Sequence, residues 1–405
     1  MAKIAIIGGG AAGLTASINA AKNNQVTIFE RNSICGKKIT ITGNGKCNYW
    51  NENQDISNYH SDDPEQLNNF FDDRIFQETK AFFKKIGLIP FIKDGYYYPY
   101  SKQAISVRNA LERTALKCGV EIKKDFLVTD IIKKEDSFFI NPQNENLKFD
   151  KVIITSGSKC APKTGSDGLG YQLASSFSHK IIKPRPALVQ LVSDANFLKH
   201  WAKIRCEALV KLYNENKELT KDRGEIQLTD YGVSGICVFN ISYLVPKLLE
   251  KKQNIFLHIN FLPFLSQKTF EEIFTFFNDR SQEFSRNTLD EMLEELIPYQ
   301  LVDVLLKEAK IKKELTWQKL NYNDQKRLIL TLTDFSLKIV DTLTFNEAQC
   351  ASGGVSLKEI DVKTMESKKV KNLYFAGEIL DVNGNCGGYN LGFAFMSGIK
   401  AGKSC

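Results

Sequence analysis

The apolar and polar residues of the first thirty positions follow the order of a β-α-β unit. Residues 3–7 and 26–29 are short apolar runs, and the small-residue segment at 12–22 between them predicts a helix. Continuous apolar runs of this length are typical of strands buried on both faces of a parallel sheet. The pattern predicts that the chain begins as an α/β protein.

Helices and short strands follow. Apolar residues at helical spacing between 67 and 86 predict one or two amphipathic helices, and residues 104–117 predict another. Asp94-Gly95 is a hairpin-turn signal before the tyrosine-rich run 96–100, whose rings either line a pocket or only pack. Polar turns then separate the strands of a predicted antiparallel meander, at 121–122, 126–132, 138–140 and 147–149. They lead into a buried strand at 151–155.

The middle of the chain differs in composition, because residues 186–340 contain only three of the 26 glycines. Strand patterns come first, at 187–192, 207–213, 224–229 and 255–262, and helical patterns second, at 268–277, 289–296, 299–307 and 324–331. The last segment holds strands at 335–345 and 373–378 and a small-residue helix at 389–401. We predict an inserted domain over 187–334, barrel-like at 187–265 and helical at 266–334, within a first domain formed by 1–186 and 335–405.

A glycine motif identifies the first candidate site. Gly8, Gly10 and Gly13 form G-x-G-x-x-G between the first predicted strand and helix. In this motif the first glycine permits a tight turn, the second lets the backbone approach a pyrophosphate, and the third lets the helix pack closely on the sheet. The helix N-terminus favours phosphate, and Glu30 at the end of the second strand can accept hydrogen bonds from a ribose. The motif predicts an ADP-containing dinucleotide and leaves NAD and FAD open.

The order of the later elements favours FAD. A meander and a return strand that breaks at Ser156-Gly157-Ser158 are typical of an FAD domain of the glutathione-reductase type, whereas an NAD dehydrogenase would continue with βα units. The sequence has no second G-x-G-x-x-G, so a separate NAD(P)H domain is not expected. A second strand end, Gly377-Glu378, suits a flavin. We expect Glu378 to hold ribityl hydroxyls or a pyrophosphate water, and the helix after Gly388 to stabilise charge on the reduced ring.

Composition narrows the class of protein. The 405 residues are 43% hydrophobic and 25% charged, which allows two or three domains. No apolar run approaches a membrane span, and nine cysteines without a C-x-x-C pair argue against disulfides or zinc. We expect a cytoplasmic protein with reduced thiols and no metal. The net charge of +7 is spread along the chain, which favours a solvated lysine surface over a nucleic-acid site.

The segment 36–48 has three glycines and three lysines. It predicts either a polar loop beside an anionic ligand or an ordinary basic surface loop. Within it, Cys47 is either a redox thiol or an inert buried cysteine, and no nearby histidine is present to activate it.

Four motifs together resemble one bacterial flavoprotein family, which includes aminoacetone oxidase and a flavoprotein of bile-acid dehydroxylation that acts on oxo-steroids. They are residues 8–13, Thr42–Asn48, Thr364–Lys368, and Ala376–Glu378 with Gly387–Leu391. The resemblance spans nearly the whole chain and implies an FAD domain with a barrel-like and helical insert. Two departures are Lys46, where arginine is common, and Ser234-Gly235-Ile236, where Ser-Gly-Pro is usual.

The resemblance also implies site residues. The ADP part is assigned to Gly8, Gly10, Gly13 and Glu30; the pyrophosphate and flavin to Lys37, Lys38, Thr42, Gly43, Asn44, Gly45, Lys46, Cys47 and Asn48; the ribityl chain and ring to Gly377, Glu378, Asn390 and Leu391. Ala12, Arg31, Gly157, Gly387 and Gly388 complete the expected cofactor-binding set. Tyr389 and Asn390 are catalytic candidates because the motif places them nearest the ring. Lys46 is a third candidate, to hold an anionic substrate or the N1/C2=O region of the flavin.

Two hypotheses result. The first is an FAD-dependent oxidoreductase that transfers hydride between flavin and a small molecule at the junction of the FAD domain and the insert. Its reaction is either amine or aminoketone oxidation or oxo/enone reduction, with NAD(P)H as a candidate donor. The second is an RNA- or protein-associated flavoprotein, such as a tRNA-modifying FAD enzyme, which the even spread of lysines disfavours. The sequence leaves the substrate, the electron acceptor and the oligomeric state open.

Overall fold

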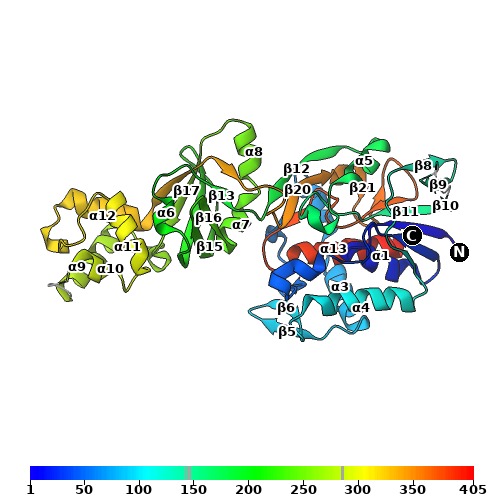
Figure 1. Ribbon diagram of the computed structural model, residues 1–405, viewed down its shortest axis with the longest axis horizontal. Coiled ribbons are helices and arrows are strands. Elements are labelled where there is room, and N and C mark those ends of the chain that lie inside the picture. The colour runs from blue at the N-terminus through cyan, green and yellow to red at the C-terminus, as the bar shows by residue number, and fades with distance from the viewer. Residues whose placement is uncertain (142, 144–146, 284–286) are drawn as a thin grey trace. The chain divides into compact units, whose positions relative to one another are not determined.

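The computed structural model describes residues 1–141, 143, 147–283 and 287–405 (Figure 1). The chain forms two compact units. Unit 1 comprises Met1–Ala187 and Phe345–Cys405, and unit 2 comprises Leu188–Thr344. Each unit has a hydrophobic core of its own. Unit 2 is therefore an insertion in the sequence of unit 1.

The centre of unit 1 is a seven-stranded sheet in the order β21-β22-β23-β11-β1-β2-β7. The strands β11, β1, β2 and β7 run parallel to one another, and β23 pairs in parallel with β11. Ile4 to Ile7 of β1 are all buried. The helix α1 packs against β1 and β11, and the strands β10 and β9 also contact these two strands. The bounds are β1 Lys3–Ile7, β2 Gln25–Phe29, β7 Glu121–Lys123, β11 Lys151–Ile154, β21 Ile360–Asp361, β22 Glu366–Ser367 and β23 Leu373–Phe375.

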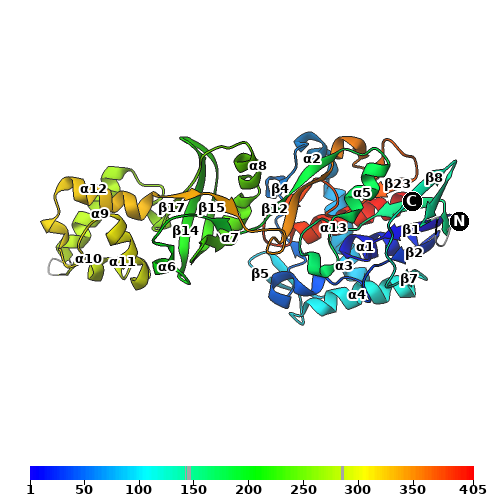
Figure 2. The same ribbon diagram turned by 45° about the horizontal axis from the view of Figure 1, so that its top comes forward.

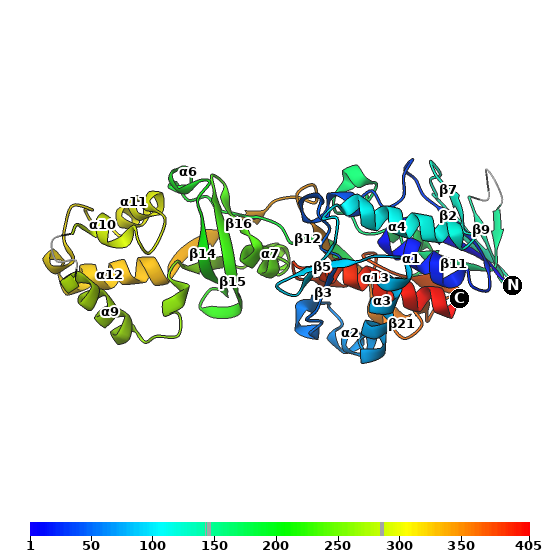
Figure 3. The same cartoon turned by 90° about the horizontal axis from the view of Figure 1, so that it is seen from below.

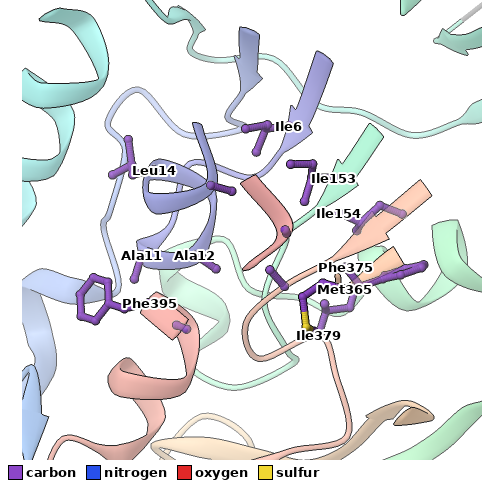
Figure 4. Close-up of a cluster of buried hydrophobic side chains, with 14 of the residues drawn as sticks. Ile6, Ala11, Ala12, Leu14, Ile153, Ile154, Met365, Phe375, Ile379 and Phe395 are labelled. Carbon is purple, nitrogen blue, oxygen red and sulfur yellow. The ribbon is translucent and has the colours of Figure 1, made fainter. Parts of the chain in front are cut away.

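Two small-residue helices pack closely against each other beside this sheet. They are α1, Ala11–Ala20, and α13, Tyr389–Ser404. A Cβ at Gly398 would lie 2.7 Å from the carbonyl oxygen of Ala12, and one at Gly402 would lie 2.3 Å from that of Ala16. The glycines of α13 are therefore needed for this approach. Figure 4 shows side chains of both helices gathered with those of β1, β11 and β23, and Figure 3 shows α4, Ala104–Lys117, beside α1.

Smaller elements of unit 1 surround this core. The predicted meander is confirmed as the antiparallel sheet β10-β9-β8, and the hairpin at Asp94-Gly95 as β5-β6, with β3 at its edge. The bounds are β3 Trp50–Asn51, β4 Tyr59–His60, α2 Pro64–Phe70, α3 Asp73–Lys85, β5 Pro90–Lys93, β6 Tyr96–Pro99, β8 Ile131–Lys134, β9 Ser137–Ile140, β10 Leu147–Phe149, α5 Leu169–Ser176, β12 Ile181–Ala187, β20 Cys350–Val355 and β24 Asn383–Gly384.

Two strand predictions near the meander were wrong. Residues 121–123 form β7 of the parallel sheet and not part of the meander. The predicted strand at 126–132 begins only at Ile131, and residues 126–130 have no strand assignment. The backbone N–H of Phe126 instead donates to the carbonyl oxygen of Glu30 over 2.9 Å, so this apolar stretch is held against the chain that follows β2.

Unit 2 contains a seven-stranded antiparallel sheet in the order β18-β17-β14-β15-β16-β13-β19. Strands β18 and β19 lie at opposite edges of the sheet but are separated in sequence only by Val340, whose N–H donates to Val192 over 2.9 Å. The sheet is therefore closed like a barrel (Figure 2). The strands are β13 Leu191–Val192, β14 Arg205–Asn214, β15 Lys217–Thr229, β16 Gly232–Gly235, β17 Ile255–Asn260, β18 Phe335–Ile339 and β19 Asp341–Thr342.

Helices complete unit 2. They are α6 Leu198–Trp201, α7 Ile236–Ser242, α8 Val245–Glu250, α9 Phe270–Glu283, α10 Leu289–Leu293, α11 Tyr299–Glu308 and α12 Tyr322–Thr333. The chain returns to unit 1 at Phe345 and not at residue 335 as expected, because β18 pairs with β17. The alternation of residues 335–339 predicts a strand correctly but does not tell which sheet it joins. No helix within the described ranges is both long and apolar enough to cross a membrane.

Candidate cofactor site

A cleft lies at the carboxyl ends of four parallel strands of unit 1. Gly8 follows β1, Glu30 follows β2, Gly157 comes after β11 and Gly377 after β23, and all four residues line the cleft. This edge is where ligands bind in open α/β sheets. Its lining reaches from Glu30, after β2, past the ends of β1 and β11 to Glu378, after β23. The cleft therefore extends across the ends of four adjacent strands, as the elongated shape of a dinucleotide requires.

The three motif glycines serve different purposes. Gly8 has φ +104°, and a Cβ at Gly13 would lie 2.0 Å from the carbonyl oxygen of Gly8. These two glycines are needed by the fold itself. Gly10 has an ordinary extended conformation, and none of the described atoms beyond its chain neighbours lies within 4 Å of where its Cβ would be. Because Gly10 lines the cleft, its missing side chain leaves room for a ligand. This is the space that a pyrophosphate requires.

Glu30 is a buried acid at the cleft, 7% exposed. Its Oε2 accepts from the N–H of Gly9 over 2.8 Å, and its Oε1 accepts from the backbone and side-chain nitrogens of Asn32 over 2.8 and 2.7 Å. An ionised carboxylate has about four acceptor positions. One position therefore remains for a donor such as a ribose hydroxyl.

Lys38 and Glu378 form an ion pair in the cleft, with Nζ 2.6 Å from Oε2. Burial acts to lower the pKa of Lys38, but the Glu378 carboxylate outweighs it and the pKa is raised overall. The other oxygen of Glu378 and the Oγ of Ser156 are buried without a hydrogen-bond partner among the described residues. Unpaired buried polar atoms are costly and rare in native proteins. Since both residues line the cleft, these atoms fit a ligand that carries hydroxyl groups.

The loop at 36–48 lines the cleft only with its first part. Lys37, Lys38 and Thr42 belong to the lining. After Thr42 the backbone turns away through left-handed conformations at Gly43, Asn44, Gly45 and Cys47. Lys46 is exposed, and the described lining does not include it.

The last residues of this loop, Cys47 and Asn48, pack into the protein, and the described lining of the cleft includes neither. Burial raises the pKa of Cys47 to about 11, which keeps its thiol protonated and favours the interpretation as an inert cysteine. The side-chain amide of Asn48 faces the carbonyl oxygens of Trp50 and Tyr97 at 2.9 and 3.2 Å, and the orientation that directs its nitrogen at them lets it donate to both. A Cβ at Gly388 would lie 2.7 Å from Trp50, so the start of α13 is pressed against this strand.

The three catalytic candidates occupy different surroundings. The amide of Asn390 brackets Gly384, accepting from its N–H and donating to its carbonyl oxygen, both over 2.8 Å. Its amide is thus committed to the loop before α13, although Asn390 lines the cleft together with Leu391. Tyr389 is buried edge-on against Tyr59, and burial raises its pKa to about 12. The described lining residues do not include Tyr389. The catalytic assignments of Tyr389, Asn390 and Lys46 stay predictions.

The sequence analysis missed several residues that line the cleft. Those with polar side chains or from distant segments include Asn32, Phe126, Leu127, Val128, Ser156, Thr164, Gly165, Ser166, Asp167 and Gln349. The turn-forming composition of residues 164–168 was a usable signal for a loop next to a ligand. Nothing local indicated that residues 126–128 leave the meander to join the site.

Comparison with known proteins identifies the family. The family described as "HI0933-like protein Rossmann domain" matches residues 2–404. The chain belongs to this family. The 3-dehydro-bile acid delta(4,6)-reductase of Clostridium scindens is 37% identical, over 100% of this chain and 99% of that protein. The ribosomal RNA dihydrouridine synthase of Escherichia coli is 28% identical, over 97% of this chain and 95% of that protein.

A solved structure shares the fold. The 3-ketosteroid-delta4-(5alpha)-dehydrogenase of Rhodococcus jostii RHA1 has a TM-score of 0.50 at 16% identity, over 100% of this chain and 96% of that one. The predicted family, the α/β class with a Rossmann-type FAD-binding domain, and the class of FAD-dependent oxidoreductase are confirmed. FAD is the cofactor that the cleft fits. When bound, it supplies the hydride chemistry, and the residues described above would hold and orient it.

Proposed function

We propose that the protein reduces a carbon–carbon double bond conjugated with a carbonyl group in an apolar small molecule of the oxo-steroid class. The observation that carries this proposal is the 37% identity with the bile-acid reductase over the full length of both proteins. The name of that enzyme describes a 3-oxo compound and the reduction of its delta-4,6 double bonds. A match of this extent includes the cofactor cleft and the whole of unit 2.

The second relative supports the same reaction type. Dihydrouridine is made from uridine by saturating a double bond that is conjugated with a ring carbonyl. Both relatives named above are therefore reductases of activated double bonds, although their substrates differ in size and charge. This common chemistry favours enone reduction over amine or aminoketone oxidation.

NAD(P)H is the proposed electron donor. Saturating one double bond takes a hydride and a proton, so one NAD(P)H and one proton are consumed for each bond reduced. The chain has a single G-x-G-x-x-G motif. We therefore propose that NAD(P)H binds only transiently, to reduce the flavin, and that it does not occupy a Rossmann domain of its own.

The test follows the visible absorption of the purified protein without oxygen. We expect a flavin spectrum that bleaches with NADH or NADPH and returns when a 3-oxo-delta-4,6 steroid is added. The control is the saturated 3-oxo steroid, which lacks the double bond and should leave the flavin reduced. Bleaching by aminoacetone, with recovery only in air, would contradict the proposal and indicate an amine oxidase.

Reduction of uridine in RNA is the second candidate. It is supported by the E. coli enzyme and by the ribosomal RNA dihydrouridine synthase of Haemophilus influenzae, which is 27% identical. The same anaerobic experiment separates the candidates, because protein-free ribosomal RNA would then restore the flavin spectrum and the steroid would not. RNA binding would also weaken steeply with salt, whereas binding of an apolar steroid would not.

A further inference from the structure

Two chain segments that line the cleft meet beside Glu30. One is Arg31-Asn32, which follows β2 and Glu30, and the other is residues 164–167, which precede α5 and its N-cap Gly168. Arg31 Nη1 lies 2.5 Å from Asp167 Oδ2 and 3.3 Å from the carbonyl oxygen of Gly165. Asn32 Nδ2 donates to the carbonyl oxygen of Thr164 over 3.1 Å. All five residues line the cleft. We call this set the clasp.

Both sides of the clasp are held in place by further contacts. Asn32 is fixed by its two hydrogen bonds to Glu30, which itself holds the N–H of Gly9 in the glycine motif. Asp167 accepts from the backbone N–H of Leu169 over 3.1 Å, at the first residue of α5. A Cβ at Gly165 would lie 2.5 Å from Asn32 Nδ2, so a glycine is required for the segments to approach. The contact is therefore specific and joins segments more than 130 residues apart.

We propose that the clasp retains FAD by closing over its adenosine end. The inference rests on the proposed function, because it requires FAD in the cleft with its ribose at Glu30. The bonds of the clasp join two segments of the cleft lining that are far apart in the sequence. With the adenosine end of FAD beneath the clasp, the segments would separate before the nucleotide leaves. Arg31 therefore acts through Asp167 as a positioning residue.

The solvent exposure of the ion pair between Arg31 and Asp167 lets the clasp open and close. The side chains of Arg31 and Asp167 are 36% and 45% exposed. Ion pairs exposed to this degree contribute little to folding and are screened by salt. The clasp can thus open without unfolding unit 1. Its effect is on the rate of FAD release and not on the stability of the fold.

The test measures FAD release from the purified holoprotein after dilution, followed by the rise in flavin fluorescence. Asp167→Asn and Arg31→Gln should each release FAD about two- to fivefold faster, the range for an exposed ion pair. The charge swap, Arg31→Asp with Asp167→Arg, should restore slow release relative to Arg31→Asp alone. Release should quicken with salt in both proteins, because the bound diphosphate is charged, but more steeply in the unaltered protein than in Asp167→Asn.

The matched control is Lys80→Gln. It breaks a pair with Glu52 whose side chains are 36% and 53% exposed, and the described lining of the cleft includes neither residue. This variant should release FAD at the unaltered rate. Unchanged release in both clasp variants, or a charge swap that rescues nothing, would overturn the inference. Protein that holds no FAD even after the cofactor is added would instead contradict the proposed function.

Discussion

Asp381 is a buried acid in the loop between β23 and α13. It is 3% exposed, and its Oδ2 accepts from the N–H of Asp62 over 2.9 Å and from Ser61 Oγ over 3.2 Å. Burial raises the pKa of this carboxyl group to about 6, with the charges of Asp62 and Asp63 acting in the same direction and the two hydrogen bonds opposing. Because ionising this buried carboxyl group costs free energy, the stability of unit 1 should depend on pH.

The sign of this effect follows from linkage. The pKa of Asp381 in the folded protein, about 6, lies above the ordinary value for an aspartate, so the folded state retains the proton to a higher pH. Its favourable contribution is complete below about pH 4 and is lost as the pH rises through 6. Asp381→Asn carries no such cost. We therefore expect the difference in free energy of unfolding between this variant and the unaltered protein to shift in favour of the variant by about 2–3 kcal/mol as the pH rises from 4 to 7.

Urea unfolding at several pH values measures this difference. Asp73→Asn, at an exposed acid in the first turn of α3, is the control and should parallel the unaltered protein. Parallel curves for Asp381→Asn as well would show that the buried carboxyl group does not control the pH dependence.

Residues that form a local motif could be assigned to the candidate site from the sequence, whereas residues that lie far away along the chain could not. Gly8, Gly10 and Glu30 lie within one β-α-β unit, so their spacing alone predicts that they share a site. Asp167 reaches the same site from more than 130 residues away. Neighbours within a motif can also diverge, as Asn390 lines the cleft while Tyr389 packs against Tyr59. Spacing gives position along the chain but not the direction of a side chain.

At the scale of elements, two glycines in the turn from β1 into α1 should respond to substitution in opposite ways, one by losing stability of the fold and the other by losing flavin. Gly13→Ala should weaken the fold of unit 1, because its Cβ would lie 2.0 Å from the carbonyl oxygen of Gly8 and α1 would have to move. Gly10→Val should leave the fold unchanged, because the space around its Cβ contains no described atom within 4 Å. Yet Gly10→Val should lose its flavin, since the valine side chain would fill the space for the pyrophosphate.

Flavin absorbance after purification and thermal unfolding of the FAD-free proteins separate the two effects. We expect Gly10→Val to be colourless with the melting temperature of the unaltered FAD-free protein. Gly13→Ala should melt several degrees lower, as a loss of about 1 kcal/mol or more would require. A fully yellow Gly10→Val protein would show that the phosphate site has been misplaced.

Elements were predicted well where one pattern dominates and poorly where two compete. The helix expected at 104–117 matches α4, because its apolar spacing is regular. Residues 126–130 have strand-like composition, but the backbone contact of Phe126 with Glu30 draws them to the cleft wall. The alternation at 335–339 gave the correct strand, whereas its sheet depends on pairing with β17, some 80 residues earlier. Pairing between distant segments leaves no local signal.

At the scale of the whole molecule, two separate cores predict two separable unfolding events. Leu305 in α11 is fully buried in the core of unit 2, and Leu14 in α1 is fully buried in that of unit 1. The residues that line the cofactor cleft all belong to unit 1. A ligand that binds only the folded form stabilises the part that binds it. FAD should therefore raise the melting temperature of unit 1 and leave that of unit 2 unchanged.

Calorimetry with and without added FAD, on a matched pair of substitutions, tests this. A leucine-to-alanine change in a core costs about 2–5 kcal/mol. Leu305→Ala should lower the melting temperature of the unit 2 transition, which does not respond to FAD. Leu14→Ala should lower the melting temperature of the unit 1 transition, which does respond to FAD. Flavin retention at low temperature should survive Leu305→Ala, because that side chain packs in a core that contributes no described residue to the cleft. A single transition that both substitutions and FAD move together would mean that the two cores unfold as one cooperative unit.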